Sequence, residues 1–440
     1  MVSDKAKQTI EGMENGRYAN NREISLGGVS YTARDVLIKA PLIARLNVYF
    51  VGGTGRGKTQ LGHDLLSYFG DSSCYAMGRP DFEPSELLKQ VRLGNLKDVK
   101  TDKELVELTE NVRKQLFFID ELNRAPPIVQ NYFFDFFDGK LVHDGKIFNL
   151  GTDGYSIGFA TGNLGDGEYV GVSDSDRALK DRMHMIVKLD HPDYRPTPQN
   201  LLGVFRGKKN PRSDMPSQSK EVTKEDILAL HKEFGDREIH PILPVLGVYF
   251  SEGLDYLENV KGNSKIKCDA RWPNLEGIRT DIDENKVFPF SPRGVLSAIG
   301  LTGALAMIAE AKGKQPNTTN LFLDALRLTS PYSGVISPTY IDQEHSGDVY
   351  SAFDTLFGAN SLNRRQIGEK VSKLEEAVAL AEIGVTDSDL LQDIAPIEGR
   401  WTAVKQAIQD YAQANKDDPN PEKIKLRDIV ARARREQGGK

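Results

Sequence analysis

Two stretches of this chain carry residues whose types and spacing could do chemistry on a phosphate. The first, GGTGRGKT at 52–59, follows the pattern G-x-x-x-x-G-K-[ST]. Glycines at these places let backbone N–H groups turn toward a phosphate, and a helix opening behind them adds the positive end of its dipole. We therefore predict ATP and Mg²⁺ as ligands. The predicted binding residues are Gly52, Gly53, Thr54, Gly55, Arg56, Gly57, Lys58 and Thr59, with Lys58 on the β- and γ-phosphates and the Thr59 hydroxyl on Mg²⁺.

The second stretch, LFFIDE at 116–121, is an apolar run that ends in two acids. Asp120 is predicted to hold Mg²⁺, and Glu121 to act as general base on the attacking water. Two acids at a strand end could instead simply face solvent, but the phosphate-loop pattern about 60 residues earlier favours the catalytic interpretation. Asn163, which follows a third apolar run, is predicted to orient the same water; its alternative is a turn asparagine in TGNLGDG.

Elements around these residues must bring them together. The runs at 47–51, 116–120 and 156–161 have the composition of buried strands, and helical segments separate them. This order predicts a parallel α/β sheet with helices on both faces, whose ligands lie beyond the carboxyl ends of the strands. All three polar clusters fall at those ends. Behind the glycines, apolar residues recur at helical spacing up to Gly70, a predicted helix C-cap.

Between the second and third strands, the sequence predicts two smaller features. NYFFDFFDG at 131–139 spaces its aromatic residues as a helix that packs on the sheet would. Asp144-Gly145, between two β-rich arms, predicts a hairpin added to the sheet.

The second half of the chain is predicted to be mostly helical. Apolar residues recur at helical spacing at 367–378 and 401–411, and a basic helical tail follows a linker at 416–423. The predicted domains are an N-terminal segment at 1–30, a nucleotide-binding α/β domain at 31–205, a helical lid at 206–340, and a helical C-terminal extension with a basic tail at 341–440.

Composition limits the classes of protein that fit. A net charge of -6, with 39% hydrophobic and 27% charged residues, is typical of a soluble protein and provides no global basic surface. Two cysteines, Cys74 and Cys268, fit a reducing compartment, and both are predicted to be buried or inert thiols. The amino terminus lacks an apolar signal region, and the longest apolar run, at 241–250, is too short to cross a membrane. A cytoplasmic location with no membrane contact is the resulting expectation.

These motifs also carry a family resemblance. IDELNRAPPIVQNYF, at 119–133, resembles the second nucleotide-site motif of the MoxR-type AAA+ ATPases, whose usual form is close to DEINRAPPKVQ. Similar segments cover roughly residues 30 to 330: GRPDFEPSELL between the nucleotide motifs, LVHDGKIFNL as the pre-sensor hairpin, FATGNLGDG as the first sensor, RALKDRMHMIVKLDHPD as the arginine-finger region, and FPFSPRGVLSAIG as the second sensor. The resemblance implies an AAA+ P-loop fold with a helical lid.

By motif position, the resemblance implies Arg182 as the arginine finger and Arg293 as the second sensor. Arg177 competes for the finger role, and Arg182 could be a surface ion-pair residue instead. The alternative to a sensor role is that Arg293 is simply an arginine at the start of a helix. A finger acts on the neighbouring subunit's nucleotide, so a ring is implied, by resemblance a homo-hexamer.

The sequence departs from the family in three places. Gly162 and Leu164 flank the first-sensor Asn in place of the usual residues, KDRM replaces the commoner LDRF, and residues 255–285 look inserted.

The sequence is compatible with three functions. The resemblance implies an ATPase that remodels a protein partner, typically one with a von Willebrand factor A domain. A nucleic-acid translocase is disfavoured by the acidic net charge and by a hairpin whose basic residues are only Lys140, His143 and Lys146. A nucleotide-gated scaffold without turnover is disfavoured by Glu121, since such a protein has no need of that acid.

Overall fold

The structure is a computed structural model of the chain. It describes residues 2–14, 16, 18, 20–53, 55–81, 89–91, 106–126, 130, 133, 136–143, 146–163, 182–206, 221–258, 264–266 and 286–438. These residues form two compact units, Met1–Arg237 with Gly300–Asn317, and Glu238–Ile299 with Thr318–Lys440. The four predicted domain boundaries stay predictions.

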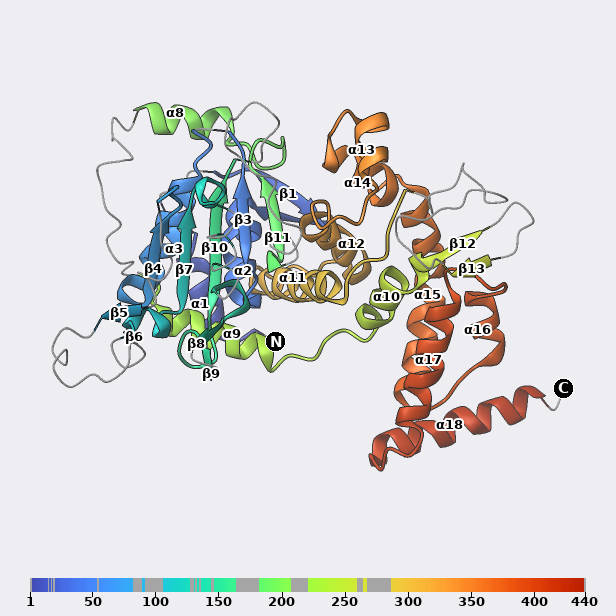
Figure 1. The fold of residues 1–440 in the computed structure, drawn as a ribbon. Helices are drawn as coiled ribbons and strands as arrows, with labels where there is room; N and C mark the ends of the chain where they lie inside the picture. The colour runs from blue at the N-terminus through green and yellow to red at the C-terminus, as the bar shows by residue number, and fades with distance from the viewer. Residues whose placement is uncertain are drawn as a thin grey trace. The chain divides into compact units, whose positions relative to one another are not determined.

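The first unit is built around a sheet (Figure 1). Its strands are β1 (Glu23–Leu26), β2 (Val29–Thr32), β3 (Val48–Val51), β4 (Ser73–Met77), β5 (Lys89–Val91), β6 (Val106–Leu108), β7 (Leu116–Asp120), β8 (Lys140–His143), β9 (Lys146–Asn149), β10 (Ile157–Gly162) and β11 (Met185–Lys188). Its helices include α1 (Asp4–Gly12), a π-helix (Asp35–Lys39), α2 (Ala40–Ala44), α3 (Lys58–Phe69), α8 (Pro198–Arg206) and α9 (Lys224–Gly235).

Five strands form the central sheet in the order β11-β3-β10-β7-β4, and every neighbouring pair is parallel. The three strands predicted from the sequence are its three inner strands, β3, β10 and β7. The order has one consequence for the site. Because β10 lies between β3 and β7, the end of β10 separates the phosphate loop from the acidic strand end. Since every neighbouring pair of strands is parallel, the predicted parallel α/β sheet is confirmed.

Helices cover both faces of this sheet, as two neighbouring residues of β7 show. Successive side chains of a strand point to opposite faces. Phe118 meets α3, where a Cβ added to Gly62 would lie 2.1 Å from its ring. Phe117 packs on the other face against Phe136, with ring centroids 4.6 Å apart. Phe136 and Phe133 are both buried, so these two residues confirm the predicted aromatic packing; Tyr132 lies outside the described residues.

The predicted hairpin is present as β8 and β9, which pair in antiparallel register from Lys140 opposite Asn149 to His143 opposite Lys146. Its turn, Asp144-Gly145, lies outside the described residues. The hairpin is a separate two-stranded sheet rather than part of the central one, as predicted.

A buried polar network ties the amino-terminal segment to α3. The Arg34 guanidinium donates to Asp64 Oδ2 at 2.6 Å, and both side chains are nearly inaccessible to solvent. The same Asp64 oxygen accepts the backbone N–H of Tyr18 at 2.9 Å. This places the Tyr18 ring beside the phosphate loop, 3.1 Å from where a Cβ on Gly57 would be. The segment before the sheet thus forms one side of the loop.

The second unit is almost entirely helical among the residues that the structure describes. It contains α10 (Ile242–Ser251), the start of α11 (Pro292–Ala311), α12 (Thr318–Thr329), α13 (Pro338–His345), α14 (Val349–Phe357), α15 (Leu362–Glu382), α16 (Ser388–Ile394), α17 (Thr402–Asn415), α18 (Pro421–Gly438) and a small hairpin of β12 (Tyr256–Glu258) and β13 (Ser264–Ile266). Its core includes a cluster of edge-on aromatic rings, Phe250, Phe290, Phe322 and Phe357. The predicted helical C-terminal extension is confirmed.

Helix α11 corrects one sequence-based expectation. Its 20 residues have a mean hydropathy of 1.6 and are, by length and composition, enough to cross a membrane. The run at 241–250 is the longest that the sequence pattern indicates, whereas α11 reaches its hydropathy over a longer segment that Ser297 and Thr302 interrupt. The buried core helix of a soluble protein passes the same test, and 61% of the apolar window of α11 is buried.

Cys74 is a free, buried thiol, in line with the prediction of a buried or inert side chain. It lies on β4 and is buried, and burial raises the pKa of its thiol to about 11. Since the thiolate is the reactive form, this raised pKa lowers the reactivity of the side chain near neutral pH. Cys268 lies outside the described residues.

Candidate functional site

The loop after β3 has the backbone of a phosphate cradle. Gly55 and Gly57 have φ values of +76° and +83°, in the left-handed region that glycine tolerates. A Cβ on Gly55 would meet nothing within 4 Å, so this part of the loop faces open space. Helix α3 begins at Lys58, directly behind Gly57, and its positive end faces the same loop. Thr54, the remaining loop position, lies outside the described residues.

Lys58 holds the loop together from within. Its ammonium donates to the carbonyl oxygens of Gly52 at 2.5 Å and Gly53 at 2.9 Å, and to Asn163 Oδ1 at 2.9 Å. Burial lowers the pKa of Lys58, and the carboxylates of Asp190, Asp120 and Glu121 oppose that effect. The ammonium is thus fixed between the loop and the end of β10, where it can meet a phosphate.

Asp120 is the buried acid at the end of β7, only 5% exposed. Its Oδ1 accepts a short hydrogen bond from the Thr161 hydroxyl. Its Oδ2 lies 3.4 Å from Thr59 Oγ1 and 3.4 Å from the Tyr75 hydroxyl. Oδ1 of Asp120 is therefore occupied by the hydrogen bond from Thr161, and Oδ2 faces Thr59 of the phosphate loop. Burial, followed by the charge of Asp120, raises the pKa of Tyr75 to about 12, so this phenol stays protonated.

Asp120 and Thr59 fit a hard divalent cation. A carboxylate oxygen and a hydroxyl oxygen face each other across 3.4 Å, and oxygen donors are those that Mg²⁺ prefers. Magnesium in nucleotide sites takes one or two protein ligands and completes its shell with phosphates and water, so two protein oxygens are sufficient.

Glu121 has an unusual backbone. Its φ of +54° and ψ of +40° place a non-glycine residue in the left-handed region. Such conformations cost about 1–3 kcal/mol and gather at functional sites. Two contacts hold it: its N–H donates to Thr161 Oγ1 at 3.0 Å, and its Oε2 pairs with Arg124 Nε at 3.1 Å. The turn directs the chain away from β7 directly after Asp120, so the two acids have different surroundings.

Thr161, near the end of β10, serves both acids with one hydroxyl. Its hydroxyl oxygen accepts a hydrogen bond from the backbone N–H of Glu121, and its O–H donates a hydrogen bond to Asp120 Oδ1. Thr161 is not among the site residues predicted from the sequence. Its position in the sequence could have indicated a role in the site, since it lies two residues before Asn163 at the end of a predicted strand.

Asn163 lies where the strand order requires, between the loop and the acids. Its side-chain oxygen accepts from Lys58 at 2.9 Å, and its backbone carbonyl accepts from Asn123 Nδ2 at 2.9 Å. The structure therefore brings together the ends of β3, β7 and β10, as predicted. The catalytic roles of Glu121 and Asn163 stay predictions.

Arg182 lies at the opposite edge of the sheet. It precedes β11, which is parallel to β3, and its carbonyl accepts from Asn47 Nδ2 at 3.4 Å, just before β3 begins. Its guanidinium pairs with Asp138 at 2.9 Å. The length of strand β3, about 3.3 Å per residue, separates it from the phosphate loop of its own chain. Arg177 lies outside the described residues.

Arg293 lies in the first turn of α11, in the part of that helix that belongs to the second unit, and its side chain is exposed. Its predicted role as second sensor stays a prediction.

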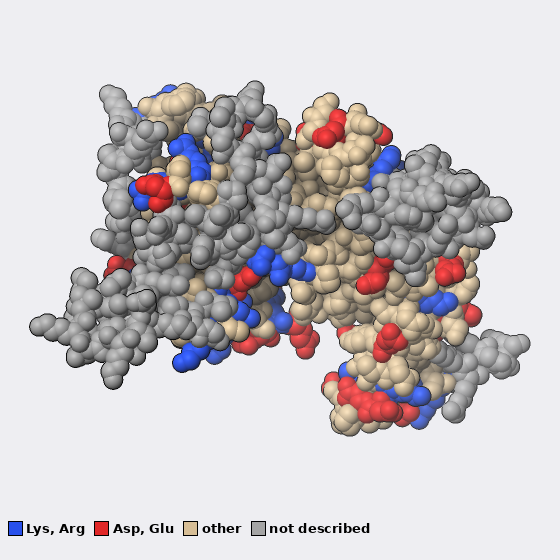
Figure 2. Space-filling view, viewed as in Figure 1, with Lys and Arg blue, Asp and Glu red and all other residues tan. Residues whose placement is uncertain are grey.

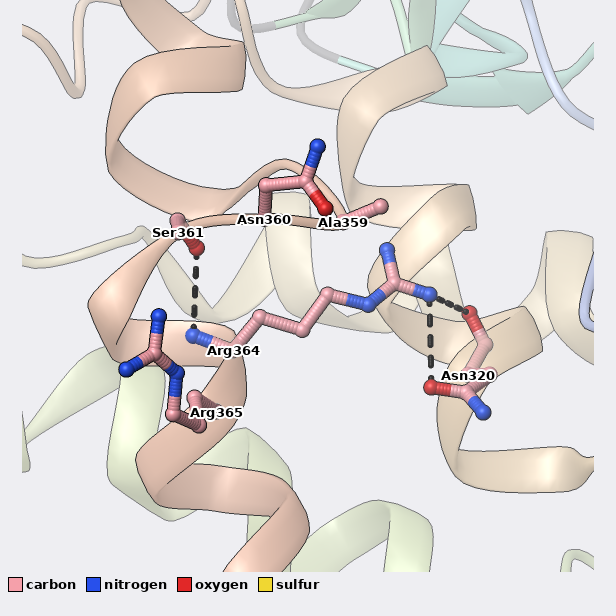
Figure 3. Close-up of a pocket in the computed structure, with 6 residues that line it drawn as sticks. All are labelled: Asn320, Ala359, Asn360, Ser361, Arg364 and Arg365. Atoms are coloured by element: carbon pink, nitrogen blue, oxygen red, sulfur yellow. Dashed lines mark hydrogen bonds between the residues drawn. The ribbon is translucent and has the colours of Figure 1, made fainter.

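A separate polar pocket of about 340 Å³ occurs in the second unit (Figure 3). Its lining residues are Asn320, Ala359, Asn360, Ser361, Arg364 and Arg365. The Arg364 guanidinium already binds Asp324 at 2.6 Å and the oxygens of Asn320 at 3.3 Å. None of the predicted site residues lines this pocket, so it is not part of the candidate nucleotide site.

Comparisons with known proteins agree with this geometry. Residues 47–183 match the profile of the AAA domain, dynein-related subfamily, which spans all three strand ends of the site. The search of curated proteins gave no match. Among solved structures, the crystal structure of a "putative ATPase" from Cytophaga hutchinsonii is similar, with a TM-score of 0.52 and 16% sequence identity over 80% of this chain and 93% of that one. The chain therefore has the AAA+ P-loop NTPase fold, and its match to the AAA domain covers residues 47–183.

Proposed function

We propose that this chain is a Mg²⁺-dependent ATPase. The observation that carries the proposal is the meeting of three strand ends, where the Lys58 ammonium, the Asp120 carboxylate and the Asn163 amide lie around the phosphate loop. A loop that only bound nucleotide would need the lysine and the backbone amides. It would not need a second acid, Glu121, held in a strained conformation beside the first.

The loop and α3 bind the triphosphate by backbone N–H groups, and Lys58 neutralises charge on the β- and γ-phosphates. When bound, Mg²⁺ would be held by Thr59 and Asp120 and would neutralise charge on the same phosphates. Thr161 keeps Asp120 oriented through its hydrogen bond.

Glu121 is the proposed general base. It takes a proton from a water molecule whose oxygen forms the new bond to the γ-phosphorus. The bond from that phosphorus to the β–γ bridging oxygen breaks, which gives ADP and inorganic phosphate. Asn163 and Lys58 hold the γ-phosphate and the water in line.

The site is proposed to be completed by a second copy of the chain in a ring. Arg182 cannot reach the phosphate loop of its own chain, since it lies at the amino edge of the sheet. An arginine at that edge suits a finger that enters the neighbour's site, where such residues stabilise the charge of phosphoryl transfer.

A protein partner is the proposed substrate of this motor. The support is the resemblance of the 119–133 segment to MoxR-type ATPases, whose typical partners carry a von Willebrand factor A domain. Nucleic acid is the weaker candidate. On the face shown in Figure 2, the described Lys and Arg side chains are interspersed with Asp and Glu, without one broad basic surface.

The direct test is ATP hydrolysis by the full chain with Mg²⁺, with EDTA, and with added DNA. We expect turnover with Mg²⁺, loss of turnover with EDTA, and no stimulation by DNA. Strong DNA stimulation would favour the translocase, and bound ATP without any turnover would favour a nucleotide-gated scaffold.

Thr161→Val tests the shared hydroxyl. Valine keeps the shape but leaves Asp120 and the Glu121 backbone without their common partner, so we expect kcat to fall about tenfold or more with a smaller change in KM. Steady-state kinetics measure both values. Thr152→Val, at an exposed position of the same unit, should leave them unchanged.

A further inference from the structure

Asp190 contacts the phosphate loop from beyond the end of β11, a strand that is not among those predicted to form the site. It comes two residues after β11, at the same carboxyl edge, because Lys188 of β11 lies opposite Val51 of β3. One carboxylate oxygen, Oδ2, accepts the backbone N–H of Gly53 at 2.6 Å. The other, Oδ1, pairs with Arg56 Nε at 2.5 Å. Asp190 thus contacts both the start and the far arm of the loop.

The contact with Gly53 fixes one peptide group from both sides. The carbonyl of Gly52 and the N–H of Gly53 belong to the same planar peptide and point in opposite directions. The Lys58 ammonium binds the carbonyl at 2.5 Å, and the Asp190 carboxylate binds the N–H at 2.6 Å. A cation and an anion therefore hold this peptide in one orientation, with the charges matched to its dipole.

Gly52 is required by the same arrangement. Its φ of +147° lies in a region that other residues avoid, and a Cβ there would lie 2.8 Å from Asp190 Oδ2. Only a glycine lets the carboxylate approach the loop this closely. The first glycine of the motif thus serves the Asp190 contact as well as the turn.

The main chain of the same segment is anchored as well. The Leu189 N–H donates to the Val51 carbonyl at 2.8 Å, which extends the pairing of β11 and β3 up to Asp190. The Asp190 carbonyl in turn accepts a short hydrogen bond from Arg195. The carboxylate is therefore presented by a fixed backbone, which suits a positioning role.

We propose that Asp190 is a positioning residue of the phosphate loop, which holds the Gly52–Gly53 peptide and Arg56 in the shape that receives the β- and γ-phosphates. This inference rests on the proposed ATPase function. A loop held in its binding shape loses less entropy when nucleotide binds. Without the carboxylate, the Gly53 N–H loses its partner and the carbonyls that fix Lys58 can rotate.

The test compares Asp190→Ala, Asp190→Asn and the matched control Asp193→Ala. Asn keeps an oxygen acceptor for the Gly53 N–H but loses the charge that pairs with Arg56. Asp193 lies in the same segment and contacts His191 (Oδ2 to Nδ1, 3.4 Å), so its removal makes the same charge change away from the described loop contacts. Measured are the Kd for ADP by calorimetry, KM and kcat for ATP, and Tm.

We expect Asp190→Ala to weaken ADP binding and raise KM about tenfold, the loss typical of one hydrogen bond to a charged group, with kcat changed less. Asp190→Asn should lie between Asp190→Ala and the wild type. Asp193→Ala should stay within about twofold of the wild type, and the three variants should share its Tm within a few degrees.

Two results would overturn the inference. One is wild-type affinity in Asp190→Ala. The other is an equal loss in Asp190→Ala and Asp190→Asn together with a large fall in Tm, which would show a role in folding instead. Failure of the proposed function looks different, since the wild-type chain itself would then fail to bind ADP or to hydrolyse ATP.

Discussion

Glu121→Gln should lower kcat for ATP hydrolysis by about 10² to 10⁴-fold and leave ATP affinity close to that of the wild type. Glutamine has the same shape but cannot accept the proton of the attacking water. Binding should persist because the loop, Lys58 and Asp120 are unchanged. Steady-state turnover and ATP binding in the presence of Mg²⁺ measure the two effects separately.

Glu110→Gln is the matched control for this variant. It makes the same chemical change at an exposed residue of the same unit and should retain wild-type turnover. If Glu121→Gln turned over ATP at the wild-type rate, another group would be the base. Loss of binding together with turnover would show that the side chain supports the loop rather than the chemistry.

Arg182→Ala should lower kcat by about 10³ to 10⁵-fold, the range for removal of an arginine finger. ATP binding to each chain should be retained, since Arg182 lies at the far edge of the sheet from its own phosphate loop. The same substitution breaks the ion pair with Asp138, in which both partners are partly exposed. Such pairs contribute little to stability, so Tm should change by a few degrees at most.

Asp138→Asn separates these two effects. It removes the ion pair but leaves the guanidinium, so it should keep most of the activity. An equal loss in Asp138→Asn and Arg182→Ala would show that the ion pair, and not a finger, is what matters.

Mixing two inactive variants tests where the arginine acts. Glu121→Gln subunits keep Arg182, and Arg182→Ala subunits keep Glu121. If the finger enters the neighbouring site, a mixed ring contains some sites with both groups and activity returns. If the arginine acted within its own chain, no mixture could regain activity.

Local sequence patterns were sufficient for the inner part of the sheet. The run LFFID predicts a buried strand because all its residues but the last are apolar. Strand β7 begins and ends where this run does, and all of its residues are buried. Gly70 caps α3 as its position after the last apolar residue indicated. The glycine loop and the acids also follow from local rules, since each is tied to the end of one strand.

Contacts between distant segments were not accessible in this way. Asp190 also closes an apolar run, MIVKLD, which is the same signal as LFFID, but nothing local shows that its strand lies beside β3. Tyr18 lies beside Gly57 and is held there in part by Asp64, which pairs with Arg34, a residue 30 positions away in the sequence. Sheet order and buried ion pairs depend on the whole fold, and periodicity does not encode them.

The most direct test of the central claim, an ATPase site completed by a neighbouring subunit, is ATP hydrolysis per subunit across a wide range of protein concentration with Mg²⁺ present. Specific activity should rise steeply as subunits assemble and then reach a plateau, and Arg182→Ala should remove the rise. Activity that is the same at every concentration, including those at which the chain is a monomer, would contradict a site shared between subunits.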